Sequence, residues 1–319
     1  MLRAKREAFG SLSLAGEQRR FEWEFLENPA RDPRLPVALV LKDLDRIVAG
    51  FAFVPYRVQI GSDVVIGAAG IDLFVAASHR SGGLSRRVVE PFWRDGFCAF
   101  PFSTGLNAAS DHLFRSCGGT LLGGAREPTA HAYFVEGAHP PPPALPHHEV
   151  EIVTDLPADY DALWAAISRG ARLIVVRDAA YLRWRYLQFP FARCTVLRAH
   201  HRRATTGIAI VQRDPMHDRL YLLELLTQRG DDAACRALLM AGTALADASG
   251  AKILYYSTRA ADQVACLRAA GFESAPGDVP TYMAKLHPSA ASTGVTVHDW
   301  YVSLGDGDML FDVGGPRDP

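Results

Sequence analysis

The chain has 319 residues, of which 49% are hydrophobic and 22% charged, as in globular rather than disordered proteins. Its 34 Lys and Arg against 35 Asp and Glu give a net charge of −1, which argues against nucleic acid or an anionic membrane as a partner. The apolar stretches are shorter than the roughly 18 residues of a membrane-spanning helix, and residues 1–20 do not resemble a signal peptide. Five scattered cysteines without a CxxC pair argue against a disulfide framework or a zinc knuckle. We therefore expect a cytoplasmic protein.

The first part of the chain predicts early strands followed by alternating strands and helices, which indicates an α/β domain with a mixed sheet. A short amphipathic helix ends at Pro29, because the residue before a proline is biased away from helical geometry. Alternating or continuous apolar residues predict the strands. The predicted strands are 37–43, 46–58, 64–76 and 98–104, the predicted helices are 84–96 and 108–118, and a closing pair lies near 120–124 and 131–137.

A proline-rich segment near the middle of the chain predicts a domain boundary. HPPPPALPHH, from His139 to His148, contains four consecutive prolines, which favour a stiff polyproline II spacer. We therefore predict an N-terminal domain at 1–138, a linker at 139–150 and a C-terminal domain at 151–319.

Three pairs of segments predict that the second half repeats the first. FEWEFLENP pairs with LRWRYLQFP, AGFAFV with TGIAIV, and HLFRSCGG with ACLRAAGF, in the same order. Slowly drifting offsets are what differences in loop length would produce. The offsets are 161 between Trp23 and Trp184, 157 between Gly50 and Gly207, and 153 between Arg115 and Arg268. The predicted elements of the second half are a short helix that ends at Pro190, strands at 195–201, 205–214, 219–227, 251–258 and 280–288, and helices at 232–250 and 261–271.

A turn that joins a predicted strand to a predicted helix has the composition of a diphosphate-binding site. Residues 80–85, RSGGLS, contain two adjacent glycines, which permit close backbone approach and positive φ angles. Such a turn points backbone N–H groups outward, where they attract a diphosphate together with the positive end of the helix dipole. Arg80 adds a positive charge. An ordinary glycine turn would have the same composition, so the turn alone leaves both interpretations open.

Two motifs in the first half resemble the GCN5-related N-acetyltransferase (GNAT) superfamily. Arg80-x-x-Gly83-x-Ser85 is similar to its acetyl-coenzyme A motif, with serine as the last small residue. Asn107-x-x-Ser110-x-x-x-Phe114 is similar to its later Asn-x-x-Ala-x-x-x-Tyr segment, whose Asn helps to hold the pantetheine arm. The resemblance implies an acetyl-CoA or other acyl-CoA cofactor. The implied cofactor-binding residues are Phe74, Val75, Arg80, Ser81, Gly82, Gly83, Leu84, Ser85 and Asn107.

The second half lacks the cofactor motifs. Ala260 stands at the Asn place, and QRGDD (228–232) occupies the phosphate turn, where its two aspartates would repel phosphates. We infer a cofactor-binding N-terminal domain and a degenerate C-terminal one. Three looser features resemble the tandem, FemAB-like group of these acyltransferases from bacterial exopolysaccharide and cell-surface clusters: the EWEFLENP start, RDAAYLRWR (177–185), and WYVSLGDGD (300–308). The implied fold is two tandem GNAT-like domains, each a mixed, mostly antiparallel sheet flanked by helices.

Acyl transfer to an amine needs a base for the amine proton and a donor for the leaving thiolate. Asp72, on the strand before the turn, is our candidate base, although a strand carboxylate satisfied by a neighbour is an equal alternative. The family's tyrosine acid is replaced by Phe114, which cannot donate a proton, and His112 or His79 could substitute. A backbone N–H near Val75 would stabilise the developing oxyanion.

Arg183 and Arg185 are candidate contacts to an anionic group of the acceptor, with packing of Trp184 in the core and arginine–acid pairs as the alternative. We expect the acceptor in the cleft between the domains, where ligand sites tend to form. The histidines do not have a metal-ligand spacing, so no metal site is predicted. Asp306-x-Asp308, flanked by glycines, is interpreted as a turn.

The sequence therefore predicts an acetyl-CoA-dependent N-acetyltransferase that acts on a primary amine of a small molecule or amino sugar. Two alternatives remain. One is a Fem-like aminoacyl transferase that uses charged tRNA, against which the near-neutral charge argues. The other is a non-catalytic module that binds acyl-CoA or a glycan. The oligomeric state, the acceptor and the acyl chain length are left open.

Overall fold

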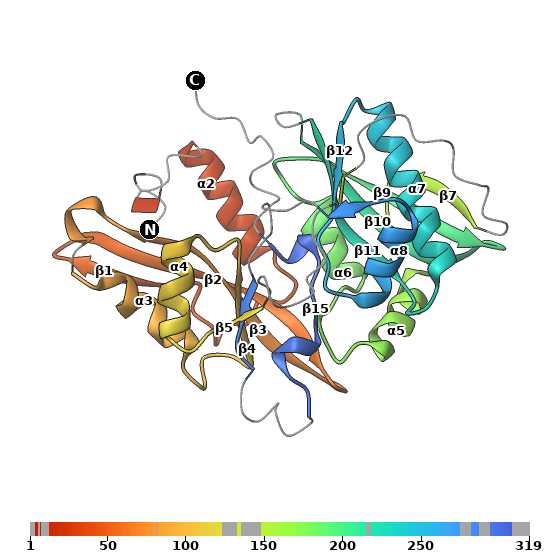
Figure 1. Ribbon diagram of the computed structural model, residues 1–319. Coiled ribbons are helices and arrows are strands. Elements are labelled where there is room, and N and C mark those ends of the chain that lie inside the picture. The colour runs from red at the N-terminus through yellow and green to blue at the C-terminus, as the bar shows by residue number, and fades with distance from the viewer. Residues whose placement is uncertain are drawn as a thin grey trace. The chain divides into compact units, whose positions relative to one another are not determined.

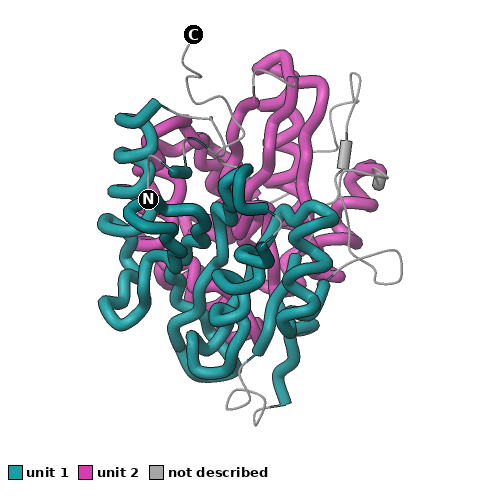
Figure 2. Tube along the Cα trace, turned by 90° about the vertical axis from the view of Figure 1, so that its left-hand side faces the viewer, with its two compact units in different colours: residues 1–124, 281–300, 315–319 teal, residues 125–280, 301–314 magenta. Residues whose placement is uncertain are grey.

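The computed structural model describes residues 4–5, 7, 13–80, 82–122, 133–134, 148–214, 218–274, 282–286 and 294–307. The chain divides into two compact units (Figure 2). Unit 1 comprises Met1–Gly124, Thr281–Trp300 and Gly315–Pro319, and unit 2 comprises Ala125–Pro280 and Tyr301–Gly314. None of the helices in the described ranges is long and apolar enough to cross a membrane.

Unit 1 begins with a helix, continues with a sheet, and takes its last strand from the C-terminal part of the chain (Figure 1). Its elements are α2 (Leu14–Phe21), the π-helical turn η1 (Glu22–Leu26), β1 (Ala38–Asp43), β2 (Arg46–Ile60), β3 (Asp63–Val75), the 3-10 turn η2 (Ala77–His79), α3 (Leu84–Trp93), β4 (Phe100–Thr104), α4 (Ala108–Ser116), β5 (Thr120–Leu122), β14 (Tyr282–Ala284) and the 3-10 turn η4 (Val297–Asp299). Strand β15 (Trp300–Tyr301) lies where the two units divide.

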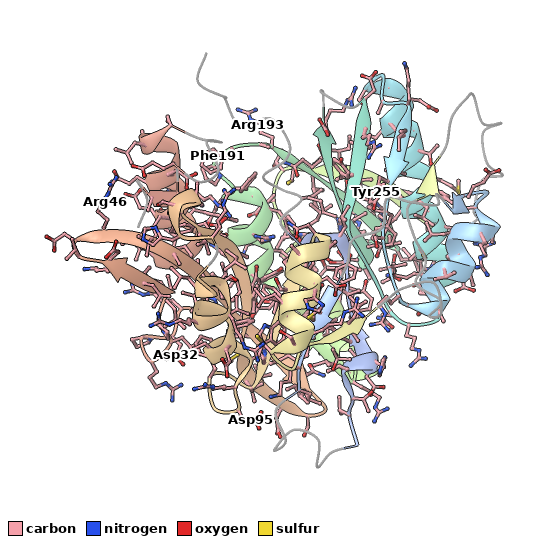
Figure 3. The ribbon with its side chains drawn as sticks, turned by 60° about the vertical axis from the view of Figure 1, so that its left-hand side comes forward. Asp32, Arg46, Asp95, Phe191, Arg193 and Tyr255 are labelled. Atoms are coloured by element: carbon pink, nitrogen blue, oxygen red, sulfur yellow. The ribbon has the colours of Figure 1, made fainter. Side chains whose placement is uncertain are left out.

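The sheet of unit 1 runs in the order β2–β3–β4–β14–β5, with β1 paired to β2. Strands β2 and β3 form a long antiparallel hairpin, which turns at Gly61 with a φ of 60°. Strand β4 pairs with β3 in parallel, and β14 lies antiparallel between β4 and β5. Lys285, just after β14, forms an ion pair of 2.8 Å with Asp95, which Figure 3 labels.

Aromatic side chains fill the core between this sheet and helices α3 and α4. Phe51 and Phe53 lie on the same face of β2, and Phe92 of α3 packs against both at centroid distances of 5.3 and 5.1 Å. Trp93 and Phe114 complete the cluster. The alternation of side chains along β2 and the 3.6-residue period of α3 therefore direct an apolar face of each element into the same core.

Unit 2 has its own sheet, in the order β12–β11–β10–β9–β7. Its elements are β6 (Tyr133–Phe134), β7 (Glu149–Val153), α5 (Tyr160–Gly170), β8 (Leu173–Val175), α6 (Ala179–Leu182), the π-helical turn η3 (Arg183–Leu187), β9 (Cys194–His201), β10 (Ala204–Asp214), β11 (Arg219–Thr227), α7 (Asp232–Ala248), β12 (Ile253–Tyr255), α8 (Ala261–Ala269), β13 (Glu273–Ser274) and the 3-10 turn η5 (Leu304–Asp306). The predicted mixed α/β fold is thus observed in each unit.

Elements of the two units correspond at the offsets that the sequence pairs predicted. The rare π-helical turns η1 and η3 both cover the repeated Trp motif, 161 residues apart. Helices α4 and α8 have the same length and lie 153 residues apart. In both units an antiparallel hairpin is followed by a parallel pair, β3–β4 in unit 1 and β11–β12 in unit 2.

Each unit contains one strand that its own half of the sequence does not supply. Strand β14 follows β13 in the chain but belongs to the sheet of unit 1. Strand β6 follows β5 in the chain but pairs antiparallel with β13 of unit 2. Residues 281–300, which the predicted boundaries assign to the C-terminal domain, are therefore part of unit 1, and most of the predicted linker, 139–147, lies outside the described residues.

Candidate functional site

In unit 1 the parallel strands β3 and β4 separate before they end. Their pairing covers Gly67 with Phe100 through Ala69 with Phe102. At the point of separation, Ser103 Oγ donates a 2.7 Å hydrogen bond to the carbonyl of Gly70. Strand β3 continues to Val75, so its last residues are not paired to β4. Such an opening at the carboxyl ends of parallel strands is where ligands bind in α/β sheets.

A β-bulge places Asp72 in this part of β3. Gly50 pairs with Phe74 but Ala52 pairs with Ile71, so β3 contains one extra residue in this stretch. Asp72 adopts a φ of 53°, which costs free energy in a residue other than glycine. Bulges are over-represented next to active sites because they redirect a side chain.

Asp72 is held by an ion-pair cluster. Lys5 Nζ lies 2.7 Å from Asp72 Oδ2 and 2.9 Å from Glu17 Oε2. Arg20 Nη1 lies 3.4 Å from Asp72 Oδ1, and Arg20 Nε lies 3.3 Å from Glu24 Oε2. Burial raises the pKa of Asp72, but the charges of Arg20 and Lys5 outweigh burial and bring that pKa below its usual value. Asp72 is therefore ionised at neutral pH.

The turn after β3 leads into α3 through a glycine in the left-handed conformation. Gly83 has a φ of 65° and stands at the N-cap of α3, so no side chain caps the first N–H groups of that helix. Both Gly82 and Gly83 are exposed, as is Arg80, and Leu84 and Ser85 are half-buried at the start of the helix. Ser81 lies outside the described residues.

Asn107 precedes α4, and its side chain caps that helix. Its Oδ1 accepts hydrogen bonds from the N–H groups of Ala109 and Ser110 at 3.1 and 3.0 Å. The side chain remains exposed. Asn107 therefore stabilises the start of α4 through its Oδ1.

The predicted proton donors are not gathered around Asp72. His112 is exposed on α4, and His79 Nε2 lies 3.3 Å from Asp43 Oδ2. Phe114 is 1% exposed and packs against Phe51 and Trp93, so this position belongs to the core.

In unit 2 protein side chains occupy the equivalent opening between β11 and β12. The parallel pairing ends at Tyr221 and Tyr255. Gln263 Nε2 and Tyr301 Oη both donate to the carbonyl of Leu225, at 2.6 and 2.9 Å. Asp231 Oδ1 accepts the N–H of Ala234 at the start of α7. The carbonyl of Leu225 and the N–H of Ala234 are thus hydrogen-bonded to side chains of unit 2 itself.

The two candidate acceptor-binding arginines do not come together. Arg183 is exposed and pairs with Asp155 at 2.9 Å. Arg185 is 2% exposed, and its Nη2 donates to the carbonyls of Gly305 and Gly307 at 3.1 and 2.7 Å. The prediction that Arg185 contacts the acceptor is therefore corrected: Arg185 has a structural role. Burial among backbone carbonyls cannot be read from a run of arginines in sequence.

Sequence analysis missed the role of Arg177. Its guanidinium is fully buried and contacts Glu224 at 2.9 Å and Asp306 at 2.6 Å. Tyr186 Oη donates to Glu224 Oε1 at 2.6 Å. The RDAAYLRWR and WYVSLGDGD segments thus bind each other, and Asp306, interpreted as a turn residue, also caps η5. Among the described residues, no group of three or more His, Cys, Asp or Glu side chains is arranged to hold a metal ion.

Comparisons with known proteins relate the chain to GNAT structures through its fold. Neither a family model nor a curated protein matches the sequence. A GCN5-related N-acetyltransferase from Kribbella flavida matches with a TM-score of 0.61 and 16% identity, over 91% of this chain and 70% of the other. One from Anabaena variabilis matches with a TM-score of 0.59 and 13% identity, over 89% and 69%. A probable N-acyltransferase of unknown function from Enterococcus faecalis matches with a TM-score of 0.59 and 12% identity, over 89% and 69%. The chain therefore has the fold of GCN5-related N-acetyltransferases.

Proposed function

We propose that the protein is an acyl-CoA-dependent N-acyltransferase that transfers an acetyl group to a primary amine of a small molecule or amino sugar. The observation that carries this proposal is the separation of β3 from β4, which leads directly into the Gly83 turn and α3. The fold, which is that of N-acetyltransferases, supports it.

The opening and the turn offer different groups to the two parts of the cofactor. The unpaired edge of β3 near Phe74 and Val75 offers backbone groups to a pantetheine arm. The backbone N–H groups of residues 82–85, with the charge of Arg80, suit the diphosphate. Asn107 would contact the pantetheine arm from α4. The cofactor supplies the activated acyl thioester.

We propose further that the chain consists of two tandem GNAT-like domains, related to the FemAB-like group, of which only the first binds cofactor. The matched π-helical turns and the matched positions of α4 and α8 support a duplication. Gln263 and Tyr301 in the opening of unit 2 support its loss of cofactor binding.

In this proposal Asp72 takes the proton of the acceptor amine, directly or through a water molecule. Its ionised state suits it to accept a proton, and its lowered pKa makes it a weak base. The engagement of Asp72 by Lys5 and Arg20 favours a second candidate, a non-catalytic acyl-CoA-binding module. The substitution Asp72→Asn separates the two candidates, because it should abolish turnover in an enzyme, whereas a non-catalytic binding module has no turnover to lose.

Calorimetric titration of acetyl-CoA into wild type and Gly83→Glu tests the cofactor site. The added carboxylate would face the diphosphate, and repulsion of about 1–4 kcal/mol between charges some 4 Å apart corresponds to a loss of affinity of roughly fivefold to a thousandfold. Gly61→Glu is the matched control, because Gly61 has a φ of 60°, and a Cβ at either glycine meets nothing within 4 Å. Both variants carry the same backbone strain and charge, so equal affinities would contradict the proposed site, and no binding to wild type would contradict the function.

A further inference from the structure

One of the four lysines of the chain is buried at the candidate base. The lysines are Lys5, Lys42, Lys252 and Lys285. Lys42 and Lys252 are exposed, and Lys285 pairs with Asp95. Lys5 is 4% exposed, although lysine is almost never fully buried unless it is paired.

The Lys5 ammonium lies between two carboxylates, Asp72 at 2.7 Å and Glu17 at 2.9 Å. Glu17 is 1% exposed, and its Oε1 has no hydrogen-bond partner within the described ranges. Within the described residues, the ion pairs of this cluster join Lys5 and Arg20 to Glu17, Glu24 and Asp72. Two carboxylate oxygens at 2.7 and 2.9 Å favour a cationic group in the place that Lys5 Nζ occupies.

The Lys5 ammonium contacts a residue in the part of β3 that is not paired with β4. Asp72 lies at the bulge of β3, three residues beyond Ala69, the last residue of β3 that pairs with β4. A primary amine, the chemical group that the proposed reaction consumes, is thus held against the proposed base.

On the basis of the proposed function, we propose that Glu17 and Asp72 form the amine subsite of the acyltransferase and that Lys5 is an internal acceptor, acetylated by the cofactor bound to its own unit. The substrate class of the subsite is a primary alkylammonium group.

The reaction balances without a further reactant. The ammonium of Lys5 loses one proton to Asp72, and the neutral Nζ attacks the thioester carbonyl of the acetyl-CoA. The C–N bond forms, the C–S bond breaks, and the second Nζ proton is transferred to the coenzyme A thiolate, while the first proton passes from Asp72 to water. The product is an uncharged amide, which no longer pairs with Glu17 or Asp72.

The test is quantitative mass spectrometry of all four lysines after incubation of the full chain with isotope-labelled acetyl-CoA. We expect acetylation at Lys5 at least tenfold faster than at Lys42 and Lys252. The rate at Lys5 should not change over a tenfold range of protein concentration, because the reaction occurs within one chain. Acetic anhydride serves as the reactivity control, since it modifies lysines according to exposure and should leave Lys5 for last.

Variants separate this inference from the proposed function. Gly83→Glu and Glu17→Gln should each lower acetylation of Lys5 at least tenfold, whereas Gly61→Glu should not. Acetylation that favours Lys42 and Lys252, or that rises with protein concentration, would overturn the inference. If acetyl-CoA binds wild type in the calorimeter under those conditions, the proposed cofactor site survives that result. If it does not bind, the proposed function fails first.

Discussion

Adding one methyl group at Gly305 should strongly lower the stability of unit 2. A Cβ on Gly305 would overlap Tyr186 Oη and lie 3.0 Å from Glu224 Oε1. Tyr186 cannot simply rotate away, because its hydroxyl donates a 2.6 Å hydrogen bond to Glu224, which is fully buried. Either the tyrosine or the 3-10 turn η5 must move, and the carboxylate of Glu224 then loses a donor.

Two costs combine in Gly305→Ala. Overpacking of a buried site costs about 1–3 kcal/mol, and loss of a hydrogen bond to a buried charged group costs about 1.5–3 kcal/mol. We therefore expect a loss of about 3–5 kcal/mol in the free energy of unfolding. For a unit of this size, about 3 kcal/mol corresponds to a drop in Tm of roughly 6–12 °C.

Urea unfolding followed by circular dichroism, with calorimetry to resolve separate transitions, measures this loss. Gly170→Ala is the control in the same unit, since Gly170 ends α5 and its Cβ would meet its nearest neighbour, Arg229 Cβ, at an ordinary 3.8 Å. That variant should be neutral or slightly stabilising. A loss below about 1 kcal/mol for Gly305→Ala would refute the packing argument, because an effect that small is typical of a surface substitution.

Two further predictions concern buried charge. Arg177→Ala leaves the buried carboxylates of Glu224 and Asp306 without their cation and should lower the free energy of unfolding by about 3–5 kcal/mol. Arg183→Ala removes an exposed pair with Asp155 and should lower it by less than about 1 kcal/mol. Equal changes in Tm would contradict the assignment of Arg177 as the buried partner of both carboxylates. The ionised Asp72 stabilises the fold above the pKa that it has in the unfolded chain, and this stabilisation is lost as the pH falls through its lower pKa in the folded state. Between these two pKa values, Asp72→Asn should make the fall in unfolding free energy shallower by up to about 1.4 kcal/mol per pH unit in urea titrations, and an unchanged slope would show that Lys5 and Arg20 do not hold the carboxylate ionised.

Local pattern and repetition were enough to predict most elements of the sheets. The apolar alternation of β2 and the run of β11 identify their strands, and the repeated Trp motif marks two π-helical turns that no propensity scale would separate from α-helix. The glycine turn at Gly83 was also predictable, since only glycine adopts a φ of 65° without strain. Strand β7 and helix α5 were not among the predicted elements.

What the sequence did not predict depends on contacts between distant residues. Arg177 and Asp306 are 129 positions apart, and nothing local distinguishes a buried arginine from a partly exposed one such as Arg183. The ion pairs of Lys5 with Glu17 and Asp72 likewise follow from the return of β3 past α2. The pairing of β14 with β4 and β5 could not be anticipated, because a three-residue strand carries too little pattern to specify its partners.

The placement of β14 also fixes the order in which a ribosome can complete unit 1. Strand β5 ends at Leu122, yet the strand that lies between it and β4 ends at Ala284, so 162 residues must be synthesised before this sheet can close. At about 5–20 residues per second, the nascent unit waits roughly 8–30 s with the partner edges of β4 and β5 unpaired. Edges of that kind are templates for pairing with other chains. The yield of correctly folded protein should therefore depend on how fast the second half is translated.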